Sequence, residues 1–201
     1  MVIAKGEEWG QRVHKQGVVC IQSDHDVFSH LAFPIKGDIA QTIGSGQRKR
    51  SASKQFDTQV EWHQLPFDVI EVVIDGATLQ AAAHLRAGHL LWGECHLLCN
   101  VAFYKGKRVF AKSHPNDAKV ELLTMAREMG VRQRFMAFMK VSQGSHLPHP
   151  QMKSRQVTTE YFHFDKSLPI FVDGKKIGRA TELKISVIAD AINIYIPSDQ
   201  E

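Results

Sequence analysis

Alternation of apolar and polar residues dominates the chain from about residue 65 onward. Residues 67–74, 78–85 and 119–125 carry the signals of strands with one buried face. Asp75-Gly76 and Asp173-Gly174 separate such runs, and Asp-Gly predicts a tight hairpin because both turn positions tolerate positive φ. The apolar run 89–101 fits one or two buried strands. Most of the chain is therefore expected to form short antiparallel strands.

The clearest helical pattern covers residues 131–142 and is followed by Gly144. It brings Val131, Phe135, Phe138 and Met139 to one face and leaves Arg132 and Arg134 off that face, as in an amphipathic helix. Many strands and one good helix predict a mainly β (α+β) fold, a two-sheet, sandwich-like domain with one amphipathic helix.

The first third of the chain has a different character. A strand is predicted over residues 17–21, and Asp38 is a plausible N-cap of a short helix that ends at Gly44. Residues 45–54, SGQRKRSASK, are polar and basic, which favours a flexible loop over a phosphate cradle because the Gly-Lys-Ser/Thr ending of a P-loop is missing. We therefore divide the chain into an N-terminal segment (1–44), a basic linker or loop (45–60) and a β-rich domain (61–201).

Composition narrows the class of protein. The 201 residues carry a formal net charge of +4, and no apolar run reaches the roughly 18 residues that a transmembrane helix needs. The first 15 residues have no signal-peptide core. We expect a soluble cytoplasmic protein, with Cys20, Cys95 and Cys99 as reduced thiols. The basic residues around the helix lack interleaved aromatics, so no nucleic-acid partner is predicted, although an anionic headgroup or a peripheral membrane contact remains open.

Two histidines in a proline-rich segment are candidates for chemistry. His146 and His149 lie in GSHLPHP, directly after the predicted helix. Their spacing is not that of a known zinc site, so structural hydrogen bonding is favoured over a metal. Contact with a phosphate or lipid headgroup is the other option, and an enzyme with a histidine-bound metal stays an alternative.

Several short segments share a fixed order along the chain. They are Gly37–Gly44 (GDIAQTIG), Phe67–Ile70 with Asp75-Gly76, Asn100 with Gly106, His114–Lys119, Gly144–Pro150 and Phe171–Gly174. In this order they resemble segments of the bacterial lipid kinases related to diacylglycerol kinase and, more distantly, of NAD kinases. The resemblance implies the β-rich C-terminal domain of a two-domain kinase, with residues 1–44 as a remnant of the nucleotide-binding half.

The resemblance also implies where a site would lie. Asp38, Asn100, His146 and His149 would contact the ligand, and Asp173 would lie near it. Asp117 would bind a structural Mg²⁺ together with the backbone carbonyls of His114 and Lys119, although Ala118 replaces a glycine of the family's turn. The favoured alternative is that Asn116-Asp117 simply caps this turn.

Two departures from the family affect the expected chemistry. Lys175 stands where the family has its catalytic glutamate, and a solvated lysine is protonated near neutral pH and cannot serve as a base. The family's Gly-Gly-Asp-Gly-Thr phosphate loop is missing from residues 1–60, so ATP is a doubtful cofactor. A strongly desolvated Lys175 could still act as a base, but the adjacent Lys176 favours an ordinary solvated turn.

The leading expectation is thus a degenerate lipid kinase domain. It would bind a lipid-like or phosphorylated small molecule, without catalysis or with a partner that supplies ATP. Whether it is an enzyme stays open; a surviving activity would be ATP-dependent phosphorylation of a lipid. The alternative from another class is a non-enzymatic interaction module, and strand edges left open in a halved fold favour a homo-oligomer.

Overall fold

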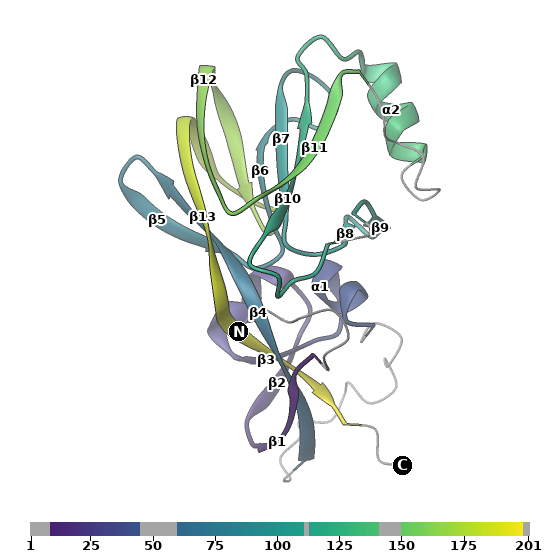
Figure 1. Cartoon of the computed structure of the whole chain (residues 1–201), viewed down its shortest axis with the longest axis vertical. Coiled ribbons are helices and arrows are strands. Elements are labelled where there is room, and N and C mark those ends of the chain that lie inside the picture. Colours follow the sequence, from purple (N-terminus) through teal and green to yellow (C-terminus); the bar gives the residue numbers. More distant parts are fainter. Residues whose placement is uncertain (1–8, 45–59, 111–112, 141–149, 199–201) are drawn as a thin grey trace.

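The structure is a computed structural model that describes residues 9–44, 60–110, 113–140 and 150–198. Strands make up most of it (Figure 1). The strands are β1 (Gln11–Lys15), β2 (Val18–Ile21), β3 (Leu31–Pro34), β4 (Val60–Ile74), β5 (Ala77–Ala81), β6 (His84–Gly88), β7 (Cys95–Cys99), β8 (Phe103–Tyr104), β9 (Lys107–Arg108), β10 (Val120–Met125), β11 (Met152–Val157), β12 (Thr159–Val172) and β13 (Lys175–Pro197). The helices are the 3₁₀ helix η1 (Asp24–Ser29), α1 (Gly37–Thr42) and α2 (Val131–Lys140).

In the described residues eleven strands form one sheet. Eight of them follow the order β1-β4-β13-β12-β6-β7-β10-β11, while β5 pairs with β4, β3 with β13, and β2 with β3. Strands β8 and β9 form a separate two-stranded ribbon. The large sheet curves so that its two halves face each other (Figure 1). One apolar cluster lies between them and joins Ile70 of β4, Leu122 of β10, Phe162 of β12 and Leu183 of β13. The predicted mainly β, two-layer fold is confirmed.

The Asp-Gly hairpins form as predicted. Asp75 and Gly76 have φ of 49° and 80°, and Asp173 and Gly174 have φ of 45° and 83°. Positive φ at both turn positions is the conformation that matches the twist of the flanking strands. The second turn joins β12 to β13, the two long strands at the centre of the sheet order.

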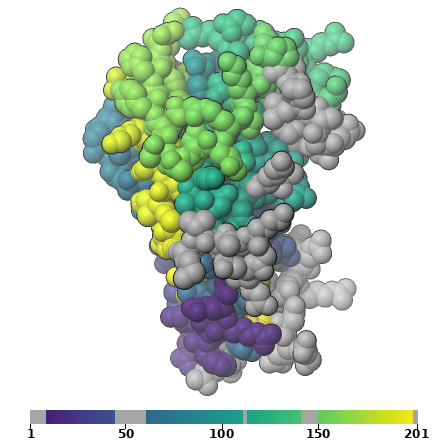
Figure 2. Space-filling model, viewed as in Figure 1, coloured from purple at the N-terminus to yellow at the C-terminus, as the bar shows by residue number. Residues whose placement is uncertain are grey.

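Residues 9–44 pack directly against the β-rich part of the chain. β1 pairs with β4, and β3 pairs with β13. Ile39 of α1 shares an apolar cluster with Phe67 of β4 and Ile194 of β13. In the space-filling view the N-terminal residues lie at the narrow end of an elongated molecule (Figure 2). Residues 45–59 of the predicted linker lie outside the described residues. The last residue assigned to the linker, Val60, is the first residue of β4.

Two local predictions are wrong. Residues 78–85 are not one strand, because β5 ends at Ala81 and β6 begins at His84. The run 89–101 does contain one buried strand, β7, as predicted, although residues 89–94 before it form a loop with Leu91 and Trp92 exposed. Asp38 is also not the N-cap of α1, since Lys36 holds that position and Asp38 lies inside the helix.

Helix α2 is oriented opposite to the expected way. Its buried residues are Arg134 and Ala137, whereas Val131 and Phe135 are each 55% exposed. Arg134 donates hydrogen bonds to the backbone carbonyls of Met129, Ala126, His89, Leu90 and Gly93. These bonds fix the helix to the loop before β7, so Arg134, which the sequence pattern placed off the apolar face, is buried.

Candidate functional site

Asp38 of α1 connects three separate parts of the fold. Its carboxylate accepts hydrogen bonds from the amides of Lys105 and Gly106, at 2.7 and 2.8 Å. His84 Nε2 lies 2.8 Å from Asp38 Oδ2. Lys105 and Gly106 both have positive φ and form the two-residue turn of the β8–β9 hairpin. One carboxylate therefore holds α1, β6 and this hairpin together.

Asp24 precedes Asp38 in the same network. Its two carboxylate oxygens accept from the amides of Asp38 and Ile39, at 2.8 and 3.1 Å, and so satisfy the first turn of α1 from a distance. Gly37 makes this approach possible, because a Cβ at that position would lie 2.3 Å from Asp24 Oδ1. Helix α1 thus depends on a side chain of η1 instead of its own N-cap.

The two carboxylates have opposite pKa shifts. Burial raises the pKa of Asp24 to about 6, against the lowering effect of its two amide hydrogen bonds. Burial would also raise the pKa of Asp38, but the hydrogen bonds from His84, Gly106 and Lys105 outweigh it, so this pKa is lowered. Asp38 is the carboxylate that the network keeps ionised.

Asp173, in the Asp-Gly turn between β12 and β13, has a purely structural set of contacts. Its carboxylate accepts from the amides of Ala82, Ala83 and His84, each at 2.9 Å. Its own amide donates to the carbonyl of His84. Burial raises its pKa in spite of these bonds. Lys175, two residues on, is exposed, which agrees with a solvated turn.

A polar pocket of about 380 Å³ opens among these residues. Asp24, Asp38, His84 and Asp173 line it, together with Arg86, Phe171, Tyr104 and Lys105. The structure thus brings two of the sequence-predicted residues, Asp38 and Asp173, to one place.

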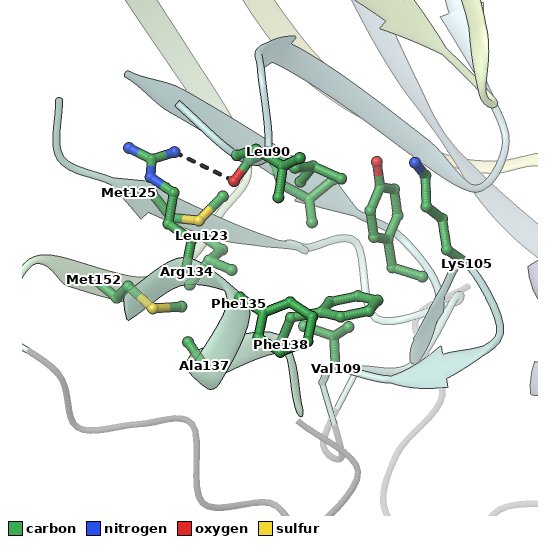
Figure 3. A pocket seen from close by; sticks show the side chains of 13 residues that line it. Leu90, Lys105, Val109, Leu123, Met125, Arg134, Phe135, Ala137, Phe138 and Met152 are labelled. Atoms are coloured by element: carbon green, nitrogen blue, oxygen red, sulfur yellow. Dashed lines mark hydrogen bonds between the residues drawn. The ribbon is translucent and has the colours of Figure 1, made fainter. Parts of the chain in front are cut away.

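A second, apolar pocket of about 270 Å³ lies beside helix α2 (Figure 3). Phe135, Ala137 and Phe138 of α2 form one side of it, and Leu97, Leu123 and Met125 of the sheet form the other. Tyr104 and Lys105 line both pockets. The two pockets therefore share part of their lining, and a polar end lies next to an apolar end.

The sheet register explains why the two ends meet. Arg86 of β6 lies opposite Leu97 of β7, and Leu97 lies opposite Leu123 of β10. Residues directly opposite on neighbouring strands share one face of a sheet. The polar end at Arg86 is therefore one strand spacing, about 4.8 Å, from the first apolar lining residue.

The remaining predicted ligand residues lie elsewhere. Asn100 is fully buried, and its side-chain amide donates to the carbonyls of Asp68 and Ala82, so it braces the wall behind the polar pocket without lining it. His146 and His149 lie outside the described residues.

The turn proposed for magnesium is held by carboxylates and amides. Asp117 Oδ1 accepts from the amide of Lys119, and Asp68 Oδ2 accepts from the amide of Ala118. His114 Nδ1 accepts from the amide of Asn116. Ala118 has a φ of 56°, so the turn does require the conformation that the family's glycine would provide.

Among the described residues, one group brings three candidate metal-binding side chains within 4.8 Å of one another: Asp24, Asp38 and His84. The hydrogen bond between His84 Nε2 and Asp38 occupies the nitrogen that would face an ion. Backbone amides occupy both oxygens of each carboxylate. This donor set fits a hydrogen-bonded network better than a cation site.

Sequence reasoning missed His84, Arg86, Tyr104 and Lys105 as site residues. Arg86 carried the clearest signal, because a charged residue inside an apolar strand (HLRAG) is rare unless it is paired or functional.

Three solved structures share this architecture. A diacylglycerol kinase from Bacillus anthracis strain Sterne matches with a TM-score of 0.54 and 10% identity, over 89% of this chain and 75% of that one. Two further structures from this strain, both of proposed diacylglycerol kinases, match with TM-scores of 0.57, at 11% and 10% identity. They cover 89% and 88% of this chain and 77% and 76% of their own.

The fold is that of the bacterial diacylglycerol kinases. The fold implied by the short sequence segments is therefore confirmed by structure. No family model and no curated protein matches the sequence. At about 10% sequence identity, structural similarity supports a shared fold and does not establish a shared activity.

Proposed function

We propose that this protein binds a lipid-like molecule whose polar head lies in the polar pocket, between Asp38 and Arg86, and whose hydrocarbon chain lies in the apolar pocket beside α2. The observation that carries the proposal is the sharing of Tyr104 and Lys105 between the polar and apolar pockets. A cleft with convergent polar groups at one end and apolar lining at the other is suited to an amphiphile. The lipid-kinase fold supports the same class of ligand.

The proposal includes weak or absent phosphoryl transfer by the chain alone. Lys175 is exposed at the position of the family's glutamate, and Asp173 has three backbone amides on its carboxylate. Neither group is arranged to accept the proton of a substrate hydroxyl. Any turnover would then depend on a partner that supplies ATP. Robust ATP-dependent phosphorylation of a lipid by the purified chain would contradict this part of the proposal.

The binding test uses two matched variants of α2. Phe135 lines the apolar pocket and Val131 does not, while both are 55% exposed. Phe135→Asp should weaken binding of monolauroylglycerol at least about tenfold, because it places a charge against the chain. Val131→Asp should leave the affinity within about threefold. Equal effects of the two variants, or no binding by the wild type, would contradict the cleft.

Helix α2, which borders the apolar pocket, is also suited to contact with a membrane surface. The exposed apolar side chains of α2 lie on the helix that borders the apolar pocket, and Arg132 and Lys140 lie on the same helix. Apolar and basic side chains together favour the interface of an anionic bilayer. No helix among the described residues is long and apolar enough to span a membrane. Co-sedimentation with phosphatidylglycerol vesicles, and not with phosphatidylcholine vesicles, is expected.

Homo-oligomer formation is the second candidate, since exposed Phe135, Met136 and Met139 could instead pack against a second copy of the chain. Light scattering that gives a concentration-independent monomer would exclude it.

The free, buried Cys95 and Cys99 suit a reducing compartment such as the cytoplasm.

Magnesium at the 114–119 turn is a separate proposal. The Asp117 carboxylate and the carbonyls of His114 and Lys119 would bind the ion, and the hydrogen bond from Lys119 to Asp117 already holds this turn. If magnesium binds, Mg²⁺ should raise the melting temperature of the wild type and not that of Asp117→Asn. An equal response of the two proteins would reject the site.

A further inference from the structure

The carboxylates of the polar pocket already have partners. Asp24 accepts from two backbone amides, Asp38 from two amides and His84, and Asp173 from three amides. Their negative charges are thus directed at the protein's own backbone. They shape the wall of the pocket and leave little capacity to bind a ligand.

Arg86 is the opposite case. Its side chain lines the polar pocket, and the residue is only 8% exposed. The partners it does have are neutral: Nη1 donates to the carbonyl of Gly88, the side chain hydrogen-bonds with those of Tyr104 and Cys95, and the guanidinium carbon lies 3.7 Å from the centre of the Phe171 ring. Its Nε is buried without a hydrogen-bond partner.

No carboxylate within the described part of the chain lies at ion-pair distance from Arg86. A buried guanidinium is normally paired with an acidic group, because an unpaired buried charge is costly. Among the described residues, Arg86 is therefore the buried cation of the polar pocket that has no direct ionic partner.

Further cations lie near Arg86. Phe171 lies between Arg86 of β6 and Lys176 of β13 in the sheet register. Burial, followed by the charges of Arg86, Arg179 and Lys176, lowers the pKa of His89. Lys105 contributes a further cation at the junction of the two pockets.

We propose that Arg86 binds an anionic headgroup, a phosphate monoester or a carboxylate, of a single-chain amphiphile. This inference rests on the proposed function and specifies the ligand class of the same cleft. The planar guanidinium suits bidentate binding of either anion, while Phe171 holds it in place. The apolar pocket begins one strand away at Leu97 and has a volume of about 270 Å³, which suits one hydrocarbon chain attached close to the anion.

The experiment measures the affinities of monododecyl phosphate, laurate and monolauroylglycerol by calorimetry for three proteins. Wild type should bind monododecyl phosphate at least about tenfold more tightly than monolauroylglycerol. Arg86→Met should remove that preference and leave monolauroylglycerol within about threefold, which also shows that the variant is folded. Arg179→Met, the loss of an exposed cation nearby, should preserve most of the preference.

The outcomes separate the two proposals. Tight binding of laurate as well as the phosphate supports a general anion site, and tight binding of the phosphate alone supports a phosphate site. Equal binding of the neutral and anionic amphiphiles by wild type overturns the role of Arg86 and leaves the cleft intact. Failure of all three amphiphiles to bind wild type overturns the cleft itself.

Discussion

Asp38 and His84 are 46 positions apart in the sequence and meet through a hydrogen bond of 2.8 Å. Both residues are buried, and the same carboxylate fixes the β8–β9 turn. Tyr104, at the junction of the two pockets, makes an edge contact with the His84 ring at 5.1 Å between centroids. This pair therefore links α1, β6 and the β8–β9 hairpin where the two pockets meet.

Asp38→Ala should lower the free energy of unfolding by about 3 kcal/mol, because it leaves His84 and two amides without their charged acceptor. Urea denaturation measures the change. Asp26→Ala is the matched control, since Asp26 is exposed in the neighbouring helix η1 and should change stability by less than about 0.5 kcal/mol. Similar values for the two variants would show that the network does not stabilise the fold.

The pH dependence follows from the opposite shifts of Asp24 and Asp38. Asp24 has a pKa of about 6 in the folded state, above its ordinary 3.8, so the folded state binds more protons between these values and stability falls as pH rises through this window. The lowered pKa of Asp38 stabilises the fold above pH 3.8, and this contribution is lost as pH falls. Carboxyl-carbon NMR titration should find Asp24 titrating well above Asp38. Coincident midpoints would contradict the prediction.

Gly37 and Gly17 offer a matched pair with positive φ, 94° and 74°. Gly37→Ala should cost about 3 kcal/mol or more, because the new methyl group would collide with the Asp24 carboxylate. Gly17→Ala should cost only about 1 kcal/mol of backbone strain, because no atom lies within 4 Å of its Cβ position. Equal losses in thermal or urea unfolding would mean that the contact with Asp24 is not required.

Arg134→Met should destabilise the attachment of α2. The variant removes hydrogen bonds to carbonyls of the 89–93 loop and of residues 126 and 129, a loss of about 3 kcal/mol locally. Relative to the wild type, hydrogen exchange in α2 should then become faster in this variant, whereas exchange in β4 should not. Arg132→Met, at an exposed position of the same helix, should leave the exchange unchanged. Unaltered protection in Arg134→Met would contradict the structural role of Arg134.

Local signals in the sequence predicted the tight turns. The Asp75-Gly76 and Asp173-Gly174 hairpins could be read directly, because a two-residue turn depends only on the conformations that its own residues tolerate. The orientation of α2 could not, since the partners of Arg134 are mostly carbonyls of a distant loop, and backbone carbonyls leave no trace in a pattern of side chains.

Only some of the residues that line the polar pocket could be predicted, because the others are brought there by contacts between distant segments. The resemblance pointed to Asp38 and Asp173, but Asp24 and His84 join them through strand register and the path of η1, which residue spacing does not encode. Arg86 is different, because an arginine within an apolar strand is visible in the sequence itself.

The clamp that Asp173 forms on residues 82–84 has a consequence for how this fold can change. Since that carboxylate holds the turn to residues 82–84, the side chain at position 175 is not needed to fix it there, and Lys175 is exposed. The identity of this side chain can therefore change during evolution while the architecture persists.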